Sequence, residues 1–379
     1  MDRTEGAVRE RKKKKLDNYY WLSGGYTDYQ LAFVTIAMVL FGLVMIFSAS
    51  SYRAVLNGLE STYFVKRQAV FSALGIFAMI VSSRFNYRAL RKFAKLAMAV
   101  SFALLVVVLI IGASSHGAVR WIEIAGIQFQ PSEVAKVALI IYMAHMCTAK
   151  PSLLMDIRGL IKLYTIPVFC IILIGAENLS TAIVCFVIVF AIGFVASPRW
   201  HLFALLAVGG AVLGFIGIFA ADYRGDRIET WLHPEKGDNF QTIQSLYAIG
   251  SGGLFGRGLG QSIQKMGFLP ESHNDMIFSI ICEELGLFGG IMVIVMFVYL
   301  IIRCRYIANH SRDRFGGLLV TGILVHIAFQ AFVNIAVVTN TIPNTGVTLP
   351  FISYGGTSLV IMLVEMGIVL SVSRQNTLS

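Results

Sequence analysis

Residues 269–302, LPESHNDMIFSIICEELGLFGGIMVIVMFVYLII, contain the two features that decide the fold. From Met276 onward the chain is almost entirely apolar, and the run is long enough to cross a bilayer as a helix. Directly before it stand four hydrogen-bonding side chains, Ser272 to Asp275. A carboxylate at the point where a helix enters lipid is costly unless it pairs or faces a wet cavity, so Asp275 is a candidate functional residue.

The rest of the chain repeats this apolar pattern. Its 379 residues are 56% hydrophobic and only 14% charged, a balance that a soluble domain of this length cannot bury. The sequence therefore predicts an all-α, polytopic membrane protein. Ten segments are expected near residues 29–50, 66–83, 95–112, 132–148, 161–176, 179–196, 202–221, 276–302, 316–338 and 356–373.

An even number of spans puts both termini on the same side of the membrane. Most of the 31 Lys and Arg residues then fall in stretches on the N-terminal side, so the positive-inside rule predicts that both termini are cytoplasmic. We expect a basic tail, residues 1–27, which lacks the apolar core of a signal peptide. A single membrane domain, residues 28–379, follows, with a long extracellular loop at 222–275. The chain is thus expected in the cell membrane.

Two other classes of function are disfavoured by composition. A net charge of +10 can attract nucleic acid, but basic loops that orient a membrane protein on anionic lipid explain it better. Cysteines at metal-ligand spacing are not found, and their number is odd, so we interpret them as packing residues without a disulfide framework. They are Cys147, Cys170, Cys185, Cys282 and Cys304.

The long loop combines basic residues with a glycine cluster between Gly250 and Gly260. Glycine lets a backbone approach a ligand closely, and basic side chains suit phosphate oxygens. This pattern predicts a site for a phosphorylated ligand at the outer face, although an ordinary flexible loop with solvated charges has the same composition. The candidate ligand-binding residues are Arg224, Arg227, Arg257 and Lys265.

A pair of charges stands at the start of the expected fourth segment. Pro131 and Ser132 are typical of a helix start, and Glu133 and Lys136 share a helix face at a spacing of three. Buried charges in a membrane protein must pair or face a wet cavity. Glu133 and Lys136 are therefore either a structural ion pair or contacts for the substrate.

Further polar residues lie inside the expected helices. His326, Gln330 and Asn334 repeat at every fourth position and form one stripe, which favours hydrogen bonding between helices. The two glutamates at 283–284 are expected to be buried and either neutral or paired. Residue Glu365, deep in the last segment, has no assigned role.

Three long stretches resemble the shape, elongation, division and sporulation (SEDS) family, whose members include RodA, FtsW and SpoVE. They are GAVRWIEIAGIQFQPSEVAK, YAIGSGGLFGRGLGQSIQKMGFLPESHNDMIFSIICEELG and PNTGVTLPFISYGGTSL. The resemblance implies a ten-helix fold and peptidoglycan glycosyltransferase activity on lipid II at the outer leaflet. It also implies a class B penicillin-binding transpeptidase as partner, together with other division or elongation proteins.

The resemblance also assigns roles to residues. The family's essential acidic residue in this loop corresponds to Asp275, and the acidic and basic residues of its QPSE-x-x-K motif correspond to Glu133 and Lys136. Its arginine before tryptophan corresponds to Arg120, and His273 joins the candidate substrate-binding residues. The reading His-Asn-Asp, rather than His-Thr-Asp, favours the FtsW and SpoVE branch.

One family motif is altered. Before the sixth segment the family often has Glu-Pro-Asp-Leu-Gly-Thr, whereas residues 177–181 read Glu-Asn-Leu-Ser-Thr. A role for the motif's aspartate therefore cannot be transferred to this chain.

The implied reaction needs a base where the lipid-anchored sugars react, just above the membrane. A sugar hydroxyl attacks an anomeric carbon while lipid pyrophosphate leaves, and Asp275 can take the hydroxyl proton. The departing pyrophosphate needs basic side chains or a divalent cation, Mg²⁺ or Mn²⁺. A single displacement predicts inversion. The alternatives are that Asp275 only caps its helix, and that the protein is a lipid II flippase or a division scaffold.

Overall fold

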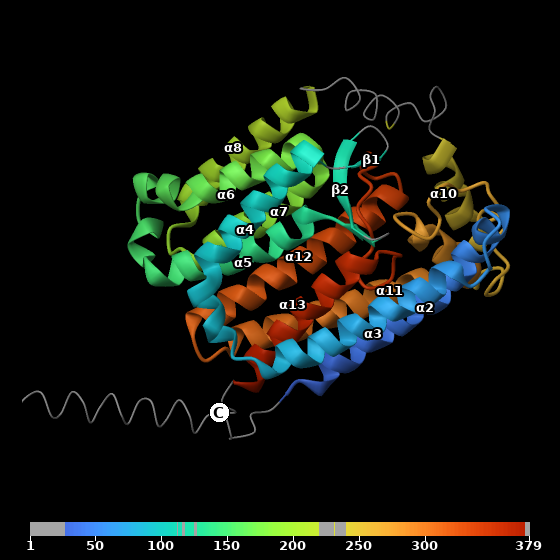
Figure 1. Cartoon of the computed structure of the whole chain (residues 1–379), viewed down its shortest axis with the longest axis horizontal. Coiled ribbons are helices and arrows are strands. Elements are labelled where there is room, and N and C mark those ends of the chain that lie inside the picture. The colour runs from blue at the N-terminus through green and yellow to red at the C-terminus, as the bar shows by residue number, and fades with distance from the viewer. Residues whose placement is uncertain are drawn as a thin grey trace, which may run out of the picture.

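The computed structural model describes residues 27–111, 113–115, 118–124, 127–219, 231 and 240–375. Within these residues, ten long helices form a bundle, and each coincides with one of the ten expected segments (Figure 1). They are α2 (Tyr29–Leu56), α3 (Tyr63–Arg84), α4 (Leu90–Ile111), α5 (Pro131–Ala149), α6 (Ile157–Glu177), α7 (Leu179–Ala196), α8 (Trp200–Phe219), α11 (Ile277–Asn309), α12 (Arg314–Val338) and α13 (Gly356–Arg374).

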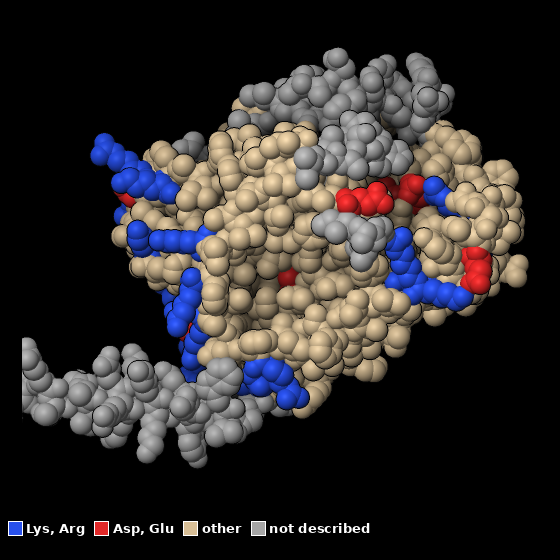
Figure 2. Space-filling model, in the orientation of Figure 1, with Lys and Arg blue, Asp and Glu red and all other residues tan. Residues whose placement is uncertain are grey.

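Eight helices in the described part of the chain are long and apolar enough to cross a membrane, and α5 and α8 are not among them. The prediction of a polytopic helical membrane protein is confirmed, whereas the count of ten spans stays a prediction. On the face shown in Figure 2, charged side chains gather toward the two ends of the molecule and the middle is almost free of them. This distribution is the one a bilayer requires.

The two ends of the described chain meet at one end of the bundle. The backbone N–H of Asp28 donates to Ser373 Oγ at 3.1 Å, and the Asp28 carboxylate accepts from Arg303 Nη2 at 2.6 Å. Basic side chains predominate at this end on the face shown (Figure 2). The positive-inside rule therefore marks it as the cytoplasmic end.

The loop between α4 and α5 contains a small sheet that the sequence analysis did not predict. Strands β1 (Ala113–Ser115), β2 (Ala118–Ile124) and β3 (Ile127–Phe129) pair in that order, each antiparallel to its neighbour. The sheet lies away from the cytoplasmic end of the bundle (Figure 1). It leads directly into α5, where Pro131 occupies the first helical position.

Two glycines of the long outer loop, Gly252 and Gly256, pack closely against the backbone of α11. The loop includes a short helix, α10 (Phe240–Gly252), and then docks on a break in α11 at Gly286, whose φ of 69° and ψ of −165° only glycine adopts readily. A Cβ on Gly256 would lie 2.1 Å from the carbonyl oxygen of Glu284. Backbone N–H groups of Arg257 and Gly258 donate to the carbonyls that the break exposes, both at 3.0 Å. Close backbone packing therefore explains Gly256 without a ligand.

Both glutamates near the start of α11 are fully buried and partnered. Lys265 Nζ lies 2.8 Å from Glu284 Oε1 and 2.9 Å from Ser48 Oγ of α2. The Glu283 carboxylate accepts the backbone N–H of Ile263 at 2.9 Å. Removing one partner of a buried ion pair costs about 3–5 kcal/mol, so the Lys265–Glu284 contact fixes the outer loop on the bundle.

The turn at 272–275 is held in place through its backbone and one ring. Asn334 Nδ2 donates to the carbonyl of Asp275 at 2.7 Å, and the N–H of Tyr354 donates to the carbonyl of His273 at 2.9 Å. The His273 ring packs against both Phe64 and Tyr354, with ring centroids 4.6 and 5.5 Å away. It is only 3% exposed, and burial lowers the pKa of His273 from 6.5 to about 4.

This buried imidazole predicts a pH-dependent loss of stability. Because its pKa is lower in the folded than in the unfolded protein, the unfolded state takes up the proton first as the pH falls below 6.5. The free energy of unfolding should then fall by about 3 kcal/mol between pH 6.5 and pH 4. In His273→Phe, which keeps an aromatic ring against Phe64 and Tyr354 but cannot take up a proton, this fall in the free energy of unfolding should vanish.

The measurement is the thermal midpoint of detergent-purified protein as a function of pH. His201→Phe, which removes an exposed imidazole at the start of α8, should leave the acid-induced loss as in the unsubstituted protein. An equally steep loss in His273→Phe would show that another group causes it.

Candidate active site

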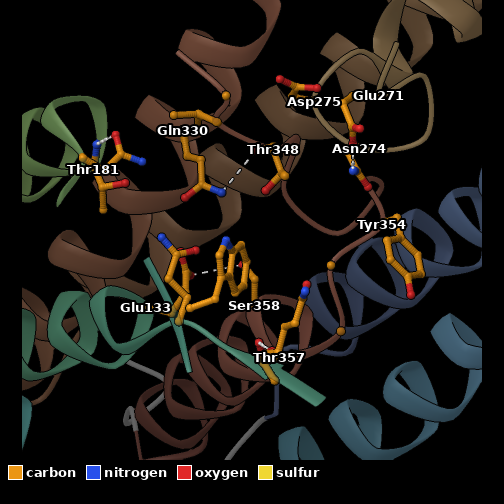
Figure 3. A pocket seen from close by; sticks show the side chains of 18 of the residues that line it. Glu133, Thr181, Glu271, Asn274, Asp275, Gln330, Thr348, Tyr354, Thr357 and Ser358 are labelled. Atoms are coloured by element: carbon orange, nitrogen blue, oxygen red, sulfur yellow. Dashed lines mark hydrogen bonds between the residues drawn. The ribbon is translucent and has the colours of Figure 1, made fainter. Parts of the chain in front are cut away.

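A pocket of about 400 Å³ opens among the ends of the helices that point away from the cytoplasmic side. Its walls come from α3, the sheet, α5, α7, α12, the 271–275 turn and the segment before α13 (Figure 3). The polar side chains that line it are Arg67, Gln128, Gln130, Glu133, Lys136, Asn178, Thr181, Glu271, Asn274, Asp275, Gln330, Thr348, Tyr354, Thr357 and Ser358. Segments far apart in the sequence therefore meet in one polar cavity.

Asp275 lies in the wall of this pocket, immediately before α11. Met276, not Asp275, is the N-cap residue of α11, and it has no side-chain cap bond. Asp275 as a whole residue is 9% exposed, and a Cβ on Gly346 would lie 3.9 Å from its Oδ2 atom. Figure 3 shows Asp275 beside Glu271 and Asn274, on the other side of the pocket from Glu133. The structure thus places the carboxylate where a pocket ligand can reach it.

Glu133 and Lys136 form the second charged part of the pocket. Lys136 Nζ lies 2.8 Å from Glu133 Oε1 and donates to Gln330 Oε1 of α12 at 3.0 Å. Glu133 Oε2 also accepts from Ser358 Oγ at 3.1 Å. The pair therefore joins α5 to α12 and α13 and lines the pocket at the same time, so the two readings of the sequence are compatible.

Arg67 of α3 is a pocket residue that the sequence analysis missed. It supplies, with Lys136, the positive charge among the described lining residues. The signal was present, because Arg67 follows Lys66 at the outer lip of an expected membrane segment, but single charges at helix ends are common. Asn178 and Thr181, which belong to the altered family motif, also line the pocket.

Other predicted ligand-binding residues lie elsewhere. Lys265 is buried against Glu284, and Arg257 is 3.9 Å from Glu283, so neither lines the pocket. His273 belongs to the 272–275 turn, but its ring packs against Phe64 and does not line the pocket. Arg224 and Arg227 lie outside the described residues. Arg120 lies in β2, its side chain outside the described part, although the next residue, Trp121, lines the pocket.

The three carboxylates of the pocket have different surroundings. Glu133 is paired with Lys136, and Glu271 Oε1 accepts from Arg53 Nη2 at 3.1 Å. Among the described residues, no three or more His, Cys, Asp or Glu side chains cluster closely enough to hold a metal ion by themselves.

This arrangement suits a ligand that carries both a hydroxyl group and a phosphate. Arginine and lysine bind phosphate oxygens, and a carboxylate at the same cavity can accept a proton from a bound hydroxyl. The cavity lies toward the non-cytoplasmic ends of the helices, which is where the head group of a lipid anchored in the outer leaflet would lie.

The chain is similar to known proteins over most of its length. Stage V sporulation protein E of Bacillus subtilis (strain 168) is 40% identical over 92% of this chain and 97% of its own length. A probable peptidoglycan glycosyltransferase FtsW of Trichlorobacter lovleyi is 39% identical over 91% of this chain and 93% of its own.

Solved structures have the same fold. The crystal structure of RodA, the rod shape determining protein of Thermus thermophilus, superposes with a TM-score of 0.68 at 27% identity, over 93% of this chain and 99% of that one. A chain from a peptidoglycan synthase complex, in a structure described as showing coordination of polymerization and crosslinking, gives a TM-score of 0.74 at 27% identity, over 92% and 98%. The sequence profile of the FtsW/RodA/SpoVE family, described as cell cycle protein, matches residues 29–378, and the chain belongs to this family of multi-pass membrane proteins.

Proposed function

We propose that this protein is a peptidoglycan glycosyltransferase that polymerises lipid II at the outer face of the cytoplasmic membrane. The observation that carries the proposal is the position of Asp275 in the wall of a polar pocket that also presents Arg67 and Lys136. Relatives that share about two fifths of its residues have names that state this activity, which supports the assignment.

In the proposed reaction Asp275 is the general base. A sugar hydroxyl of one lipid-linked substrate loses its proton to the Asp275 carboxylate and forms a bond to the anomeric carbon of the other, while the bond from that carbon to lipid pyrophosphate breaks. Among the three carboxylates that line the pocket, Asp275 is the one that the family resemblance assigns as the essential acidic residue. One base and one displacement give inversion at the anomeric carbon.

The leaving pyrophosphate is held by Arg67 and Lys136. Both line the pocket, whereas Arg257 and Lys265 of the outer loop do not. Positive charge fixed in a pocket stabilises the growing negative charge of a leaving group without reorganisation. This assignment replaces Arg257 and Lys265, whereas the candidates Arg224 and Arg227 lie outside the described residues and stay predictions.

We also propose that a divalent cation accompanies the pyrophosphate. Mg²⁺ is commonly bound by one or two carboxylates together with substrate phosphates, and Glu271 lines the pocket beside the proposed base. When bound there, the cation would neutralise phosphate charge.

The proposed partner is a class B penicillin-binding transpeptidase, which would crosslink the polymer. The similarity to a chain of a peptidoglycan synthase complex supports this.

The competing function is a lipid II flippase. A transporter needs a polar path to both faces, and within the described residues the hydrogen bonds that start at the pocket end at Glu365. Purified protein should therefore form polymer from lipid II without another polymerase.

The first test concerns the base. Asp275→Asn keeps the size of the side chain but cannot take a proton, so the turnover of lipid II should fall by about 10² to 10⁴. Thermal midpoints should stay close to that of the unsubstituted protein. Glu60→Gln, which neutralises an exposed carboxylate outside the pocket, is the matched control and should polymerise normally. Normal turnover in Asp275→Asn would exclude Asp275 as the base.

The second test separates Arg67 from its neighbour. Arg67→Gln should weaken lipid II binding by roughly 10-fold to 100-fold, the effect of losing a charged hydrogen bond. Lys66→Gln removes the same charge one residue away, from a side chain that pairs with Glu60 and does not line the pocket. Its binding should be unchanged. Equal effects of the two substitutions would mean that only overall charge matters.

The third test concerns the cation. Exhaustive treatment with a chelator should lower polymerisation, and added Mg²⁺ or Mn²⁺ should restore it, because the pocket itself offers too few carboxylates to retain a cation tightly. The measurement is the yield of glycan polymer from lipid II. Full polymerisation in the chelator would remove the cation from the mechanism.

A further inference from the structure

A chain of four side chains leads from the pocket into the interior of the helix bundle. Lys136 Nζ donates to Gln330 Oε1 at 3.0 Å, and His326 Nε2 lies 3.0 Å from the same oxygen. His326 Nδ1 lies 2.9 Å from Glu365 Oε2 and 3.1 Å from Glu365 Oε1. Lys136 and Gln330 line the pocket, whereas His326 and Glu365 do not and are fully buried.

The chemistry of these groups fixes the direction of each hydrogen bond. A lysine ammonium only donates, so the Gln330 oxygen, not its NH₂ group, must face Lys136. The NH₂ group then donates to the carbonyl of Thr348 at 3.2 Å. Because the amide oxygen only accepts, His326 Nε2 must carry a hydrogen.

The other ring nitrogen completes the chain. Whether the proton between His326 Nδ1 and Glu365 resides on the ring or on the carboxyl group, the pair is neutral as a whole, and Glu365 fixes the ring so that Nε2–H faces Gln330. Glu365 is the described end of the chain, and its side-chain hydrogen bonds within the described residues go to His326. It lies on α13, His326 and Gln330 on α12, and Lys136 on α5, so three helices are joined.

We propose that Glu365 is a positioning residue for the reaction: through His326 and Gln330 it holds the Lys136 ammonium in the pocket. This rests on the proposed function, in which Lys136 meets the lipid-linked pyrophosphate. Two hydrogen-bond donors share the Gln330 oxygen. When His326 loses its orientation, Gln330 can rotate and the lysine loses one of the two partners that hold it.

The test is a double-mutant cycle on the binding of lipid II, measured with purified protein. Glu365→Leu should weaken binding by about tenfold in the protein that keeps Lys136, and should cause no further weakening in Lys136→Met. Glu365→Gln should bind within about threefold of the unsubstituted protein, because its NH₂ group can donate to Nδ1 and leave Nε2–H facing Gln330. Thermal midpoints are recorded for every variant.

The outcomes distinguish the inference from the function on which it rests. Unchanged binding in Lys136→Met alone would overturn the proposed contact between Lys136 and pyrophosphate. Weakened binding in Lys136→Met, combined with an equal effect of Glu365→Leu in both backgrounds or with no effect at all, would overturn the positioning role. Failure of Glu365→Gln to bind better than Glu365→Leu would also overturn it.

A control for stability uses the other end of the bundle. Asp313 accepts from Arg88 Nε at 2.8 Å and from the hydroxyl of Tyr87 at 3.0 Å, and it caps α12. Asp313→Asn should lower the thermal midpoint and leave lipid II binding unchanged. If it weakened binding as much as Glu365→Leu does, general destabilisation would explain both results.

Discussion

A charge among membrane helices needs a partner, and this constraint organises the whole protein. Removing one member of a buried pair costs about 3–5 kcal/mol, whereas ordinary apolar contacts between helices compete with equally apolar lipid. The pairs therefore decide which helices lie together and in which register. In the described part of the chain, Asp28 before α2 pairs with Arg303 of α11, and His326 of α12 pairs with Glu365 of α13. Lys265 fastens the outer loop to Glu284 of α11, and the Glu133–Lys136 pair within α5 reaches α12 and α13 through Gln330 and Ser358.

The same constraint explains which parts of the fold could be predicted from the sequence. Membrane helices are predicted from long apolar runs, because a helix satisfies all backbone hydrogen bonds within one segment, and all ten expected segments are helices. Local spacing was equally informative. Glu133 and Lys136 are one helical turn apart, so their ion pair follows from position alone. Asp275 was identified because a carboxylate at the point where a helix enters lipid is costly unless it has a partner or faces a wet cavity.

Interactions between distant parts of the chain could not be predicted. Lys265 looked like a phosphate ligand because nothing local showed that Glu284, in another element, would neutralise it. Glu365 had no visible role for the same reason, since His326 lies on a different helix. Arg67 was one charge among many at helix ends, and only the folded pocket singles it out. The sheet before α5 is too short and irregular to produce a clear alternation of polar and apolar residues.

The break in α11 at Gly286 has a consequence for how the site unfolds. The nine residues before the break, 277–285, form a separate helical segment that begins directly after Asp275. Its exposed carbonyls accept from the outer loop, and Glu284 is locked to Lys265 of that loop. Local opening of the loop must therefore release this segment as well. Asp275 thus belongs to one cooperative unit with the outer loop, and amide hydrogens of the two parts should exchange with solvent through the same opening event.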